Sequence, residues 1–189
     1  MSFRVLVIPE DPTHNGYILK PLVERMLAEV GKPNARVLVL ANPKLDGYDS
    51  AVRAIRQELE ARYGFYDLWL FMPDADLAAG LDELETEAAR KGIQLLCCAA
   101  QPEVEAWLLA GYKDDLQMRW ADVRTHPRLK EEVFAPFLKD HGDPLAAGGG
   151  RERLVREALQ NYRGLTELCT ELAKLERRLR ELLVRTGGQ

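Results

Sequence analysis

Short runs of consecutive apolar residues alternate with longer amphipathic segments in the first half of the chain. The runs lack the polar alternation of strands with one solvent-facing side, so they predict buried strands over residues 5–8, 35–40, 68–72 and 93–99. Apolar residues at helical spacing predict helices between them, over residues 17–30, 50–62 and 81–91. This alternation predicts an α/β, Rossmann-type fold with a mostly parallel sheet and helices on both faces.

The pattern changes after residue 100, where helical segments follow one another without strands. Helices are expected over residues 103–110, 129–138, 151–162 and 166–184, with an irregular stretch over 111–128 and a loop over 141–150. The last helix is amphipathic and carries many charges. We therefore expect an α/β domain over residues 1–112 and a C-terminal helical extension over residues 113–189 that packs on it.

Helix ends carry their own signals. Gly31, followed by Pro33, is expected to end the first helix, and Thr13 or Asn15 to cap its start. Ser50 is expected to cap the second helix.

Composition limits the class of protein. A chain of 189 residues with 47% hydrophobic residues can bury the core of one domain, and no stretch approaches the roughly 20 apolar residues of a membrane span. The first residues lead directly into a strand without a basic segment, so we expect no signal peptide. Cys97, Cys98 and Cys169 have no zinc-site spacing. Buried free thiols and a reducing, cytoplasmic location are therefore expected.

The net charge of −4 is unevenly distributed. Residues 1–150 carry −7 and residues 151–189 carry +3. An acidic body with a basic tail is compatible with a phosphate-rich partner, but the chain has no dense basic patch of the kind that dominates nucleic-acid interfaces.

Acidic residues follow two of the expected strands. Glu10 ends the first strand, and Asp74 and Asp76 follow the third. Ligands of open α/β sheets bind beyond the carboxyl ends of the strands, where these carboxylates could converge. Close carboxylates need a proton or a cation between them, and oxygen ligands suit Mg²⁺ or Mn²⁺. Ordinary roles also fit, because Asp76 could cap a helix and Asp74 could lie in a solvated turn.

Further charged residues lie near the fourth strand and near a run of glycines. Glu103 and Glu105 follow the fourth strand at a helix start, where acids also suit the helix dipole, and Trp107 is expected in the core. Glycines at 148–150 precede Arg151 and Arg153 and are interpreted either as a phosphate-binding turn or as a flexible linker. The three histidines are dispersed, so surface or capping roles are expected for them.

These features together resemble a known family. A strand ending in Glu10, a later strand followed by Asp74-Ala75-Asp76, and the α/β alternation between them resemble the TOPRIM fold of topoisomerases, primases and overcoming-lysogenization-defect nucleases. Residues 101–109 (Gln-Pro-Glu-Val-Glu-Ala-Trp-Leu-Leu) resemble a segment of a narrower TOPRIM-like branch of unknown function, related to RloB. Proteins of that branch often occur with an ATPase partner in phage-defence loci. The resemblance covers residues 3–110 and, loosely, 145–165.

The resemblance implies roles for individual residues. Glu10 would be a general acid/base or metal-linked glutamate, Asp74 and Asp76 would bind Mg²⁺ or Mn²⁺, and Glu105 would complete the metal site. Two positions depart from the family pattern, because Asp11 replaces a usual glycine and His14 replaces a usual glutamate.

Three functions remain open from the sequence. The first is a metal-dependent nuclease that hydrolyses phosphodiester bonds of nucleic acid, in phage defence. The second is a non-catalytic TOPRIM-like subunit that partners an ATPase through the charged C-terminal helix. The third is a phosphatase of the haloacid-dehalogenase type, although its Asp-x-Asp motif follows the first strand rather than the third. A homodimer is compatible with each of them.

Overall fold

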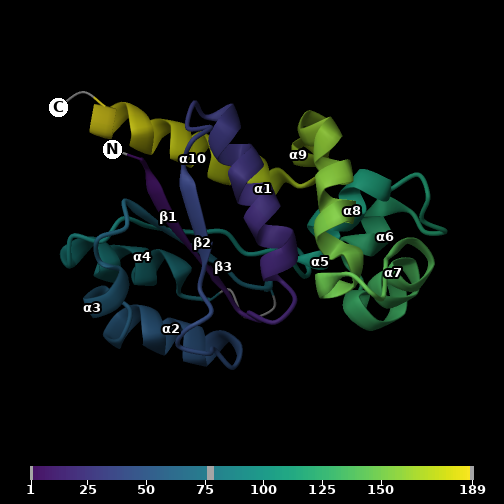
Figure 1. Ribbon diagram of the computed structural model, residues 1–189, viewed down its shortest axis with the longest axis horizontal. Helices are drawn as coiled ribbons and strands as arrows, with labels where there is room; N and C mark the ends of the chain where they lie inside the picture. Colours follow the sequence, from purple (N-terminus) through teal and green to yellow (C-terminus); the bar gives the residue numbers. More distant parts are fainter. Residues whose placement is uncertain (1, 76–78, 188–189) are drawn as a thin grey trace.

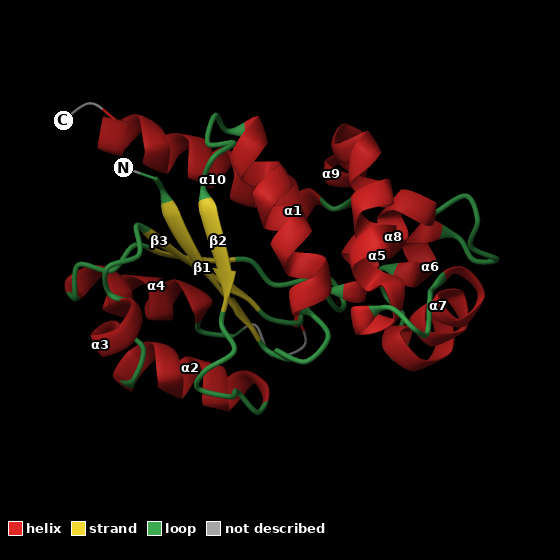
Figure 2. Ribbon diagram, in the orientation of Figure 1, coloured by secondary structure: helices red, strands yellow, loops and turns green. Residues whose placement is uncertain are grey.

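The computed structural model describes residues 2–75 and 79–187, and it confirms the α/β fold expected from the sequence. In the described part of the chain the sheet has four parallel strands in the order β2-β1-β3-β4. They are β1 (Arg4–Pro9), β2 (Arg36–Val39), β3 (Leu68–Met72) and β4 (Leu95–Cys97). Figure 2 shows β1, β2 and β3 side by side, with α1 (Gly16–Glu29) and α10 (Thr170–Gly187) on one side of them and α2 (Gly47–Gln57), α3 (Glu60–Tyr63) and α4 (Leu81–Arg90) on the other.

Alternate residues of the two central strands build two separate cores. Val5 and Leu70 point to the face covered by α1 (Gly16–Glu29) and by the C-terminal helices. Leu6 and Phe71 point to the face covered by α2 (Gly47–Gln57) and α4 (Leu81–Arg90). Because both faces of β1 and β3 are covered, these strands are continuously apolar, which is the signal that made them predictable.

The helices that follow the sheet gather at one side of the molecule, and the last one returns along the sheet (Figure 1). They are α5 (Glu105–Leu109), α6 (Trp120–Val123), a π-helical turn η3 (Lys130–Phe134), α7 (Ala135–His141), α8 (Arg151–Ala158), α9 (Tyr162–Leu168) and α10 (Thr170–Gly187). Leu172 and Leu179 of α10 belong to the same buried cluster as α1 and the sheet. The apolar side of α10 is therefore used in the core.

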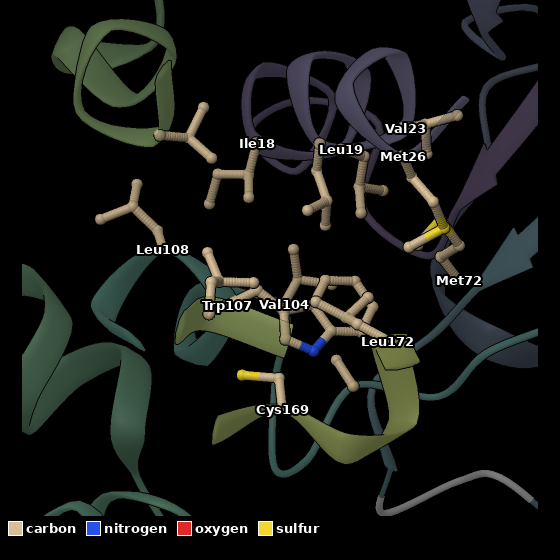
Figure 3. Packing of buried hydrophobic residues seen from close by; sticks show 14 of the residues in the cluster. Ile18, Leu19, Val23, Met26, Met72, Val104, Trp107, Leu108, Cys169 and Leu172 are labelled. Atoms are coloured by element: carbon tan, nitrogen blue, oxygen red, sulfur yellow. The ribbon is translucent and has the colours of Figure 1, made fainter. Parts of the chain in front are cut away.

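Trp107 of α5 lies at the centre of this larger core, as its apolar surroundings in the sequence indicate. It is fully buried between α1 and α10, near Leu172 and Cys169 (Figure 3). Its indole Nε1–H donates a hydrogen bond to Oε1 of Glu171 at 2.8 Å. Arg124 binds the same carboxylate through both terminal nitrogens, each at 2.7 Å, so a partly buried ion pair joins α10 to the end of α6.

Several expected helix boundaries are wrong. The helix expected over residues 50–62 begins at Gly47, so Ser50 is not its cap, and it is interrupted before α3 (Glu60–Tyr63), where Leu59 turns into the core. Asn15 stands at the start of α1 without a capping hydrogen bond from its side chain. The last expected helix divides into α9 and α10 at Cys169, whose backbone leaves the helical region.

The two edges of the sheet differ. At β4, the Cys97 N–H donates to Oε1 of Glu85 at 2.6 Å, and the Cys97 carbonyl accepts from Arg178 at 3.3 Å. Glu85 and Arg178 also form an ion pair, at 2.5 Å. These two side chains cover the outer backbone groups of Cys97, as a neighbouring strand would. At the other edge, β2 is partly exposed and Leu38 retains 40% of its surface.

The expectation for the cysteines is also met. Cys97, Cys98 and Cys169 are buried free thiols. Within the described residues, no helix combines the length and the apolar character that crossing a lipid bilayer requires.

Candidate functional site

Glu10 and Asp74 lie near each other at the switch point of the sheet, where the helices that follow two neighbouring strands cover opposite faces. Glu10 follows β1, and Asp74 follows β3 and forms an isolated bridge with Ala100 beyond β4. β1 and β3 are neighbours, and the helices that follow them, α1 and α4, cover opposite faces. Ligands of open α/β sheets bind at such switch points. The backbone N–H of Asp74 donates to Oε2 of Glu10 at 3.2 Å, which holds the two residues together.

The Asp74 carboxyl group lies in an acidic and partly buried environment. Burial is the largest effect on its pKa, and it acts with the nearby charges of Glu105, Glu10 and Glu103 to raise the value to about 7. A hydrogen bond from the Val104 N–H to Oδ1, at 2.9 Å, opposes this shift. A proton or a cation is therefore favoured at Asp74 near neutral pH.

Glu105 adds a buried carboxylate to the same place. It begins α5 and is only 1% exposed, although glutamate is rarely buried without a partner. Its Oε1 accepts no hydrogen bond within the described part of the chain, and the nearest cation is the Lys130 ammonium at 3.8 Å. A buried carboxylate oxygen that lacks a hydrogen-bond donor is an available ligand for a cation.

Lys130 reaches this acidic group from the helical part of the chain. Its Nζ lies 3.6 Å from Oδ2 of Asp11, and its backbone N–H donates to Oε2 of Glu103 at 2.9 Å. Burial would lower the pKa of Lys130, but Glu105, Asp11 and other carboxylates outweigh it and raise the pKa above the ordinary value. Lys130 is thus a charged internal counter-ion of the acidic residues.

Asp11 has the opposite shift from Asp74. Burial tends to raise its pKa, but hydrogen bonding to the Thr13 backbone and the charge of Lys130 outweigh burial and lower it. Two acids of the same site are therefore held in different protonation ranges, which is common where carboxylates have distinct chemical roles.

Arg151 is the second cation directed toward the site. Its Nη1 donates to the Gly148 carbonyl at 2.7 Å, and its guanidinium carbon lies 5.3 Å from the centre of the Phe134 ring. Its Nε is buried without a hydrogen-bond partner in the described residues. Burial lowers the Arg151 pKa, and the charges of Glu105 and Asp11, which are near enough to interact with the guanidinium, oppose that shift.

Arg153 does not join Arg151. Its terminal nitrogens bind Glu157 at 2.7 Å and the His141 carbonyl at 2.6 Å. Residues two positions apart on a helix point to different sides, so one helix start cannot direct both arginines to one phosphate. Asp76, the other expected metal ligand, lies outside the described residues.

The glycines before α8 form an ordered turn, Ala147–Gly150, called here the glycine turn. Gly148, Gly149 and Gly150 all have positive φ. A β-carbon at position 148 would approach the Tyr17 ring to 2.5 Å, so the turn packs directly on the start of α1. It places Arg151 beside the loop that carries Glu10 and Asp11.

The three histidines have ordinary roles. His14 lies 3.8 Å from Asp11, His126 lies 3.7 Å from Glu132, and His141 stacks on Phe137 at 4.4 Å. Lys130 was not among the residues expected at the site. Nothing near it in the sequence marks it, because it is brought there only by the packing of η3 against α5.

A metal ion requires several donors that converge on one point. Within residues 2–75 and 79–187, no group of three or more His, Cys, Asp or Glu is arranged to hold an ion. The donors of Glu10, Asp74 and Glu105 are all carboxylate oxygens, and one of them is buried without a hydrogen bond. This donor chemistry fits Mg²⁺ or Mn²⁺ rather than a thiolate- or imidazole-binding metal.

Comparisons with models of protein families, with curated proteins and with solved structures found no match to this chain.

Proposed function

We propose that this chain is a Mg²⁺- or Mn²⁺-dependent nuclease of the TOPRIM type, which hydrolyses phosphodiester bonds of nucleic acid. One observation carries the proposal. At the switch point of the sheet, burial and the nearby charges of Glu105 and Glu10 raise the pKa of Asp74 to about 7, and Glu10 accepts a hydrogen bond from the Asp74 backbone N–H. That arrangement favours a cation at neutral pH, and the donors are oxygens only.

Individual residues would then have distinct tasks. Asp74, Glu105 and Glu10 would hold the metal, together with Asp76. When bound, the metal would polarise the phosphate and stabilise the charge that develops on its oxygens. Glu10 would accept the proton of the attacking water on a carboxylate oxygen. The Arg151 guanidinium would contact a non-bridging phosphate oxygen.

The test is a titration with Mg²⁺ and Mn²⁺ by calorimetry, followed by cleavage assays on DNA and RNA with either metal. Asp74→Asn keeps the size of the side chain and removes its charge. We expect it to lose metal binding and to reduce cleavage by about 100-fold or more, the scale of one charge-stabilising contact. Unchanged cleavage by a folded Asp74→Asn variant would refute the assignment.

Asp114→Asn is the matched control. The Asp114 side chain is 87% exposed and, among the described residues, pairs only with the neighbouring Lys113, so this substitution should leave binding and cleavage unchanged. Equal losses in both variants would point to a general effect of charge on the protein rather than to a site.

A second function, a non-catalytic subunit of an ATPase, is favoured by the position of Lys130. Its ammonium already neutralises part of the acidic group, at 3.6 Å from Asp11 and 3.8 Å from Glu105. Such an internal cation could replace the metal and leave a site that no longer cleaves. The charged outer side of α10 would then contact the ATPase, since the apolar side is buried. Co-purification with an ATPase and no cleavage with either metal would support this alternative.

The remaining parts of the proposal concern the setting. Nucleic acid is the proposed partner. The proposed location is the cytoplasm, with which the buried, unpaired thiols are compatible. The proposal is also compatible with a homodimer. A role in phage defence rests on the resemblance of residues 101–109 to the RloB-related branch.

A further inference from the structure

A pocket of about 320 Å³ lies beside the acidic site, between the start of α1 and the end of β2. Its volume is within the range of small-molecule sites. The lining comes from the loop after β1, from α1, from the end of β2 and from α8: Pro12, Thr13, Gly16, Tyr17, Lys20, Pro21, Val39, Leu40, Ala41 and Glu152.

The pocket and the acidic site share one loop. Glu10 accepts a hydrogen bond from the Asp74 N–H, and Asp11 lies 3.6 Å from Lys130 Nζ. The next two residues, Pro12 and Thr13, line the pocket. Two residues of chain span at most about 7 Å, so the pocket begins within the length of one nucleotide of Glu10. Gly16 lets α1 approach β2 closely here, since a β-carbon at this position would lie 3.3 Å from Val39 Cγ1.

One wall of the pocket is the open edge of the sheet. The Leu40 N–H donates to the Val7 carbonyl at 2.8 Å, so the backbone of Leu40 faces β1. The backbone groups of the preceding residue, Val39, point the other way, because pairing directions alternate along a strand. The pocket therefore offers backbone donors and acceptors beside an apolar surface.

Tyr17 and Lys20 supply two further features of a nucleotide site. Tyr17 presents an aromatic ring held in place by the glycine turn. Lys20 is exposed at the rim and forms no ion pair with any described residue, so its charge is available to a phosphate. Apolar walls, an aromatic ring and hydrogen-bonding groups at an edge are what an unstacked base requires.

We propose that this pocket binds the unpaired base of the nucleotide whose phosphate lies at the acidic site. The inference rests on the proposed function and adds a substrate class to it. A base inside a duplex cannot enter such a pocket unless it leaves the stack. The substrate is therefore a single strand, an overhang or a loop rather than intact duplex.

Ala41→Trp tests the pocket. Ala41 is exposed and lines the pocket, so a tryptophan there fills it without disturbing the core. Arg36→Trp is the matched control, because Arg36 is exposed at the opposite end of β2. Binding of a fluorescent single-stranded oligonucleotide is followed by anisotropy in EDTA, so that cleavage is not needed for the measurement. A duplex of the same sequence is measured alongside.

We expect the wild type to bind the single strand about tenfold more tightly than the duplex, and Ala41→Trp to lose about tenfold in affinity, the scale of one stacked base. Arg36→Trp should bind like the wild type. Equal affinities of wild type and Ala41→Trp, equal affinities for single strand and duplex, or no binding by the wild type would each overturn the inference.

Hydrolysis of bis(p-nitrophenyl) phosphate with Mn²⁺ separates the two proposals, because this diester carries no nucleobase. Ala41→Trp should hydrolyse it at the wild-type rate if the pocket serves the base alone, and a loss of this activity would contradict the pocket's assigned role. Failure of the wild type to bind metal or to hydrolyse any diester would refute the proposed function, while the anisotropy measurement still decides the pocket.

Discussion

Replacing Asp74 with asparagine should make the folded protein more stable above neutral pH. Burial and neighbouring carboxylates raise the pKa of Asp74 from 3.8 to about 7 in the folded state. In the unfolded chain these effects are absent, and the carboxyl group ionises near its ordinary value. The folded protein therefore holds a proton that the unfolded chain releases.

The sign of the pH dependence follows from this difference. Below about pH 4 the group is protonated in both states, and the substitution should be neutral. Between about pH 4 and pH 7 the folded state binds more protons, so the free energy of unfolding of the wild type falls as the pH rises. Above about pH 7 both states are ionised and the full destabilisation is present.

The magnitude follows from the shift. About three pH units at about 1.4 kcal/mol each give an upper limit of about 4 kcal/mol. Because the carboxyl group is only partly buried, solvent screening reduces the effect, and we use about 2 kcal/mol. For a chain of this size, that stabilisation raises the melting temperature of Asp74→Asn by about 4 to 8 °C at pH 8. The asparagine side-chain oxygen can still accept the Val104 N–H.

The assay is urea or thermal unfolding of wild type, Asp74→Asn and the Asp114→Asn control, from about pH 4 to about pH 8.5, with and without Mg²⁺. A metal that binds the ionised carboxylates should restore stability to the wild type at pH 8, by about 2.7 kcal/mol at 100 times the dissociation constant, and not to Asp74→Asn. Parallel stability curves for wild type and Asp74→Asn would refute the acidic environment described for Asp74.

Three further predictions concern stability, each measured by urea unfolding at pH 7. Gly148→Ala should lower the free energy of unfolding by more than about 2 kcal/mol, because it combines a positive φ with a clash against Tyr17. Gly31 also has a positive φ, but its β-carbon would meet nothing within 4 Å, so Gly31→Ala should cost about 1 kcal/mol. Equal losses of stability would contradict the packing of the glycine turn. Arg124→Ala should lower the free energy of unfolding by about 3 to 5 kcal/mol, because it leaves the Glu171 carboxylate without its cation. The exposed Arg119→Ala control should lower it by less than about 1 kcal/mol. A similar, small loss of stability in both variants would show that the Arg124–Glu171 pair does not stabilise the fold. Lys130→Met removes the internal cation beside Asp11 and Glu105, so it should destabilise the metal-free protein and increase the stabilisation that Mg²⁺ gives. If Mg²⁺ stabilises the variant no more than the wild type, Lys130 and the metal do not compete.

The sheet was predictable because its signal is local. The run from Leu68 to Met72 is apolar on both faces and has the predicted bounds, since a strand covered on two sides cannot tolerate a polar residue. Helix ends were less predictable, because burial of single residues decided them. Leu59 interrupts the helix expected over residues 50–62, and Cys169 does the same near the C-terminus, and both are fully buried.

The candidate site was only partly accessible to sequence reasoning. Glu10 and Asp74 could be paired in advance, because neighbouring parallel strands end at one edge. Their partner Lys130 could not, since it arrives from η3 through tertiary packing. Arg151 and Arg153 have different partners, because proximity in the sequence ignores the 3.6-residue period that separates their directions on α8, and their binding of phosphate stays a prediction.

The unequal edges of the sheet limit how copies of this chain could assemble. Glu85 and Arg178 occupy the outer backbone groups of Cys97, while the β2 edge stays open and exposes Leu38. A sheet with two open edges can extend into a filament, but at β4 the outer groups of Cys97 are already bonded, which disfavours pairing of another strand there. Association of two copies through β2 is therefore favoured to stop at a pair, and breaking the Glu85–Arg178 pair would free the Cys97 groups for strand pairing at β4.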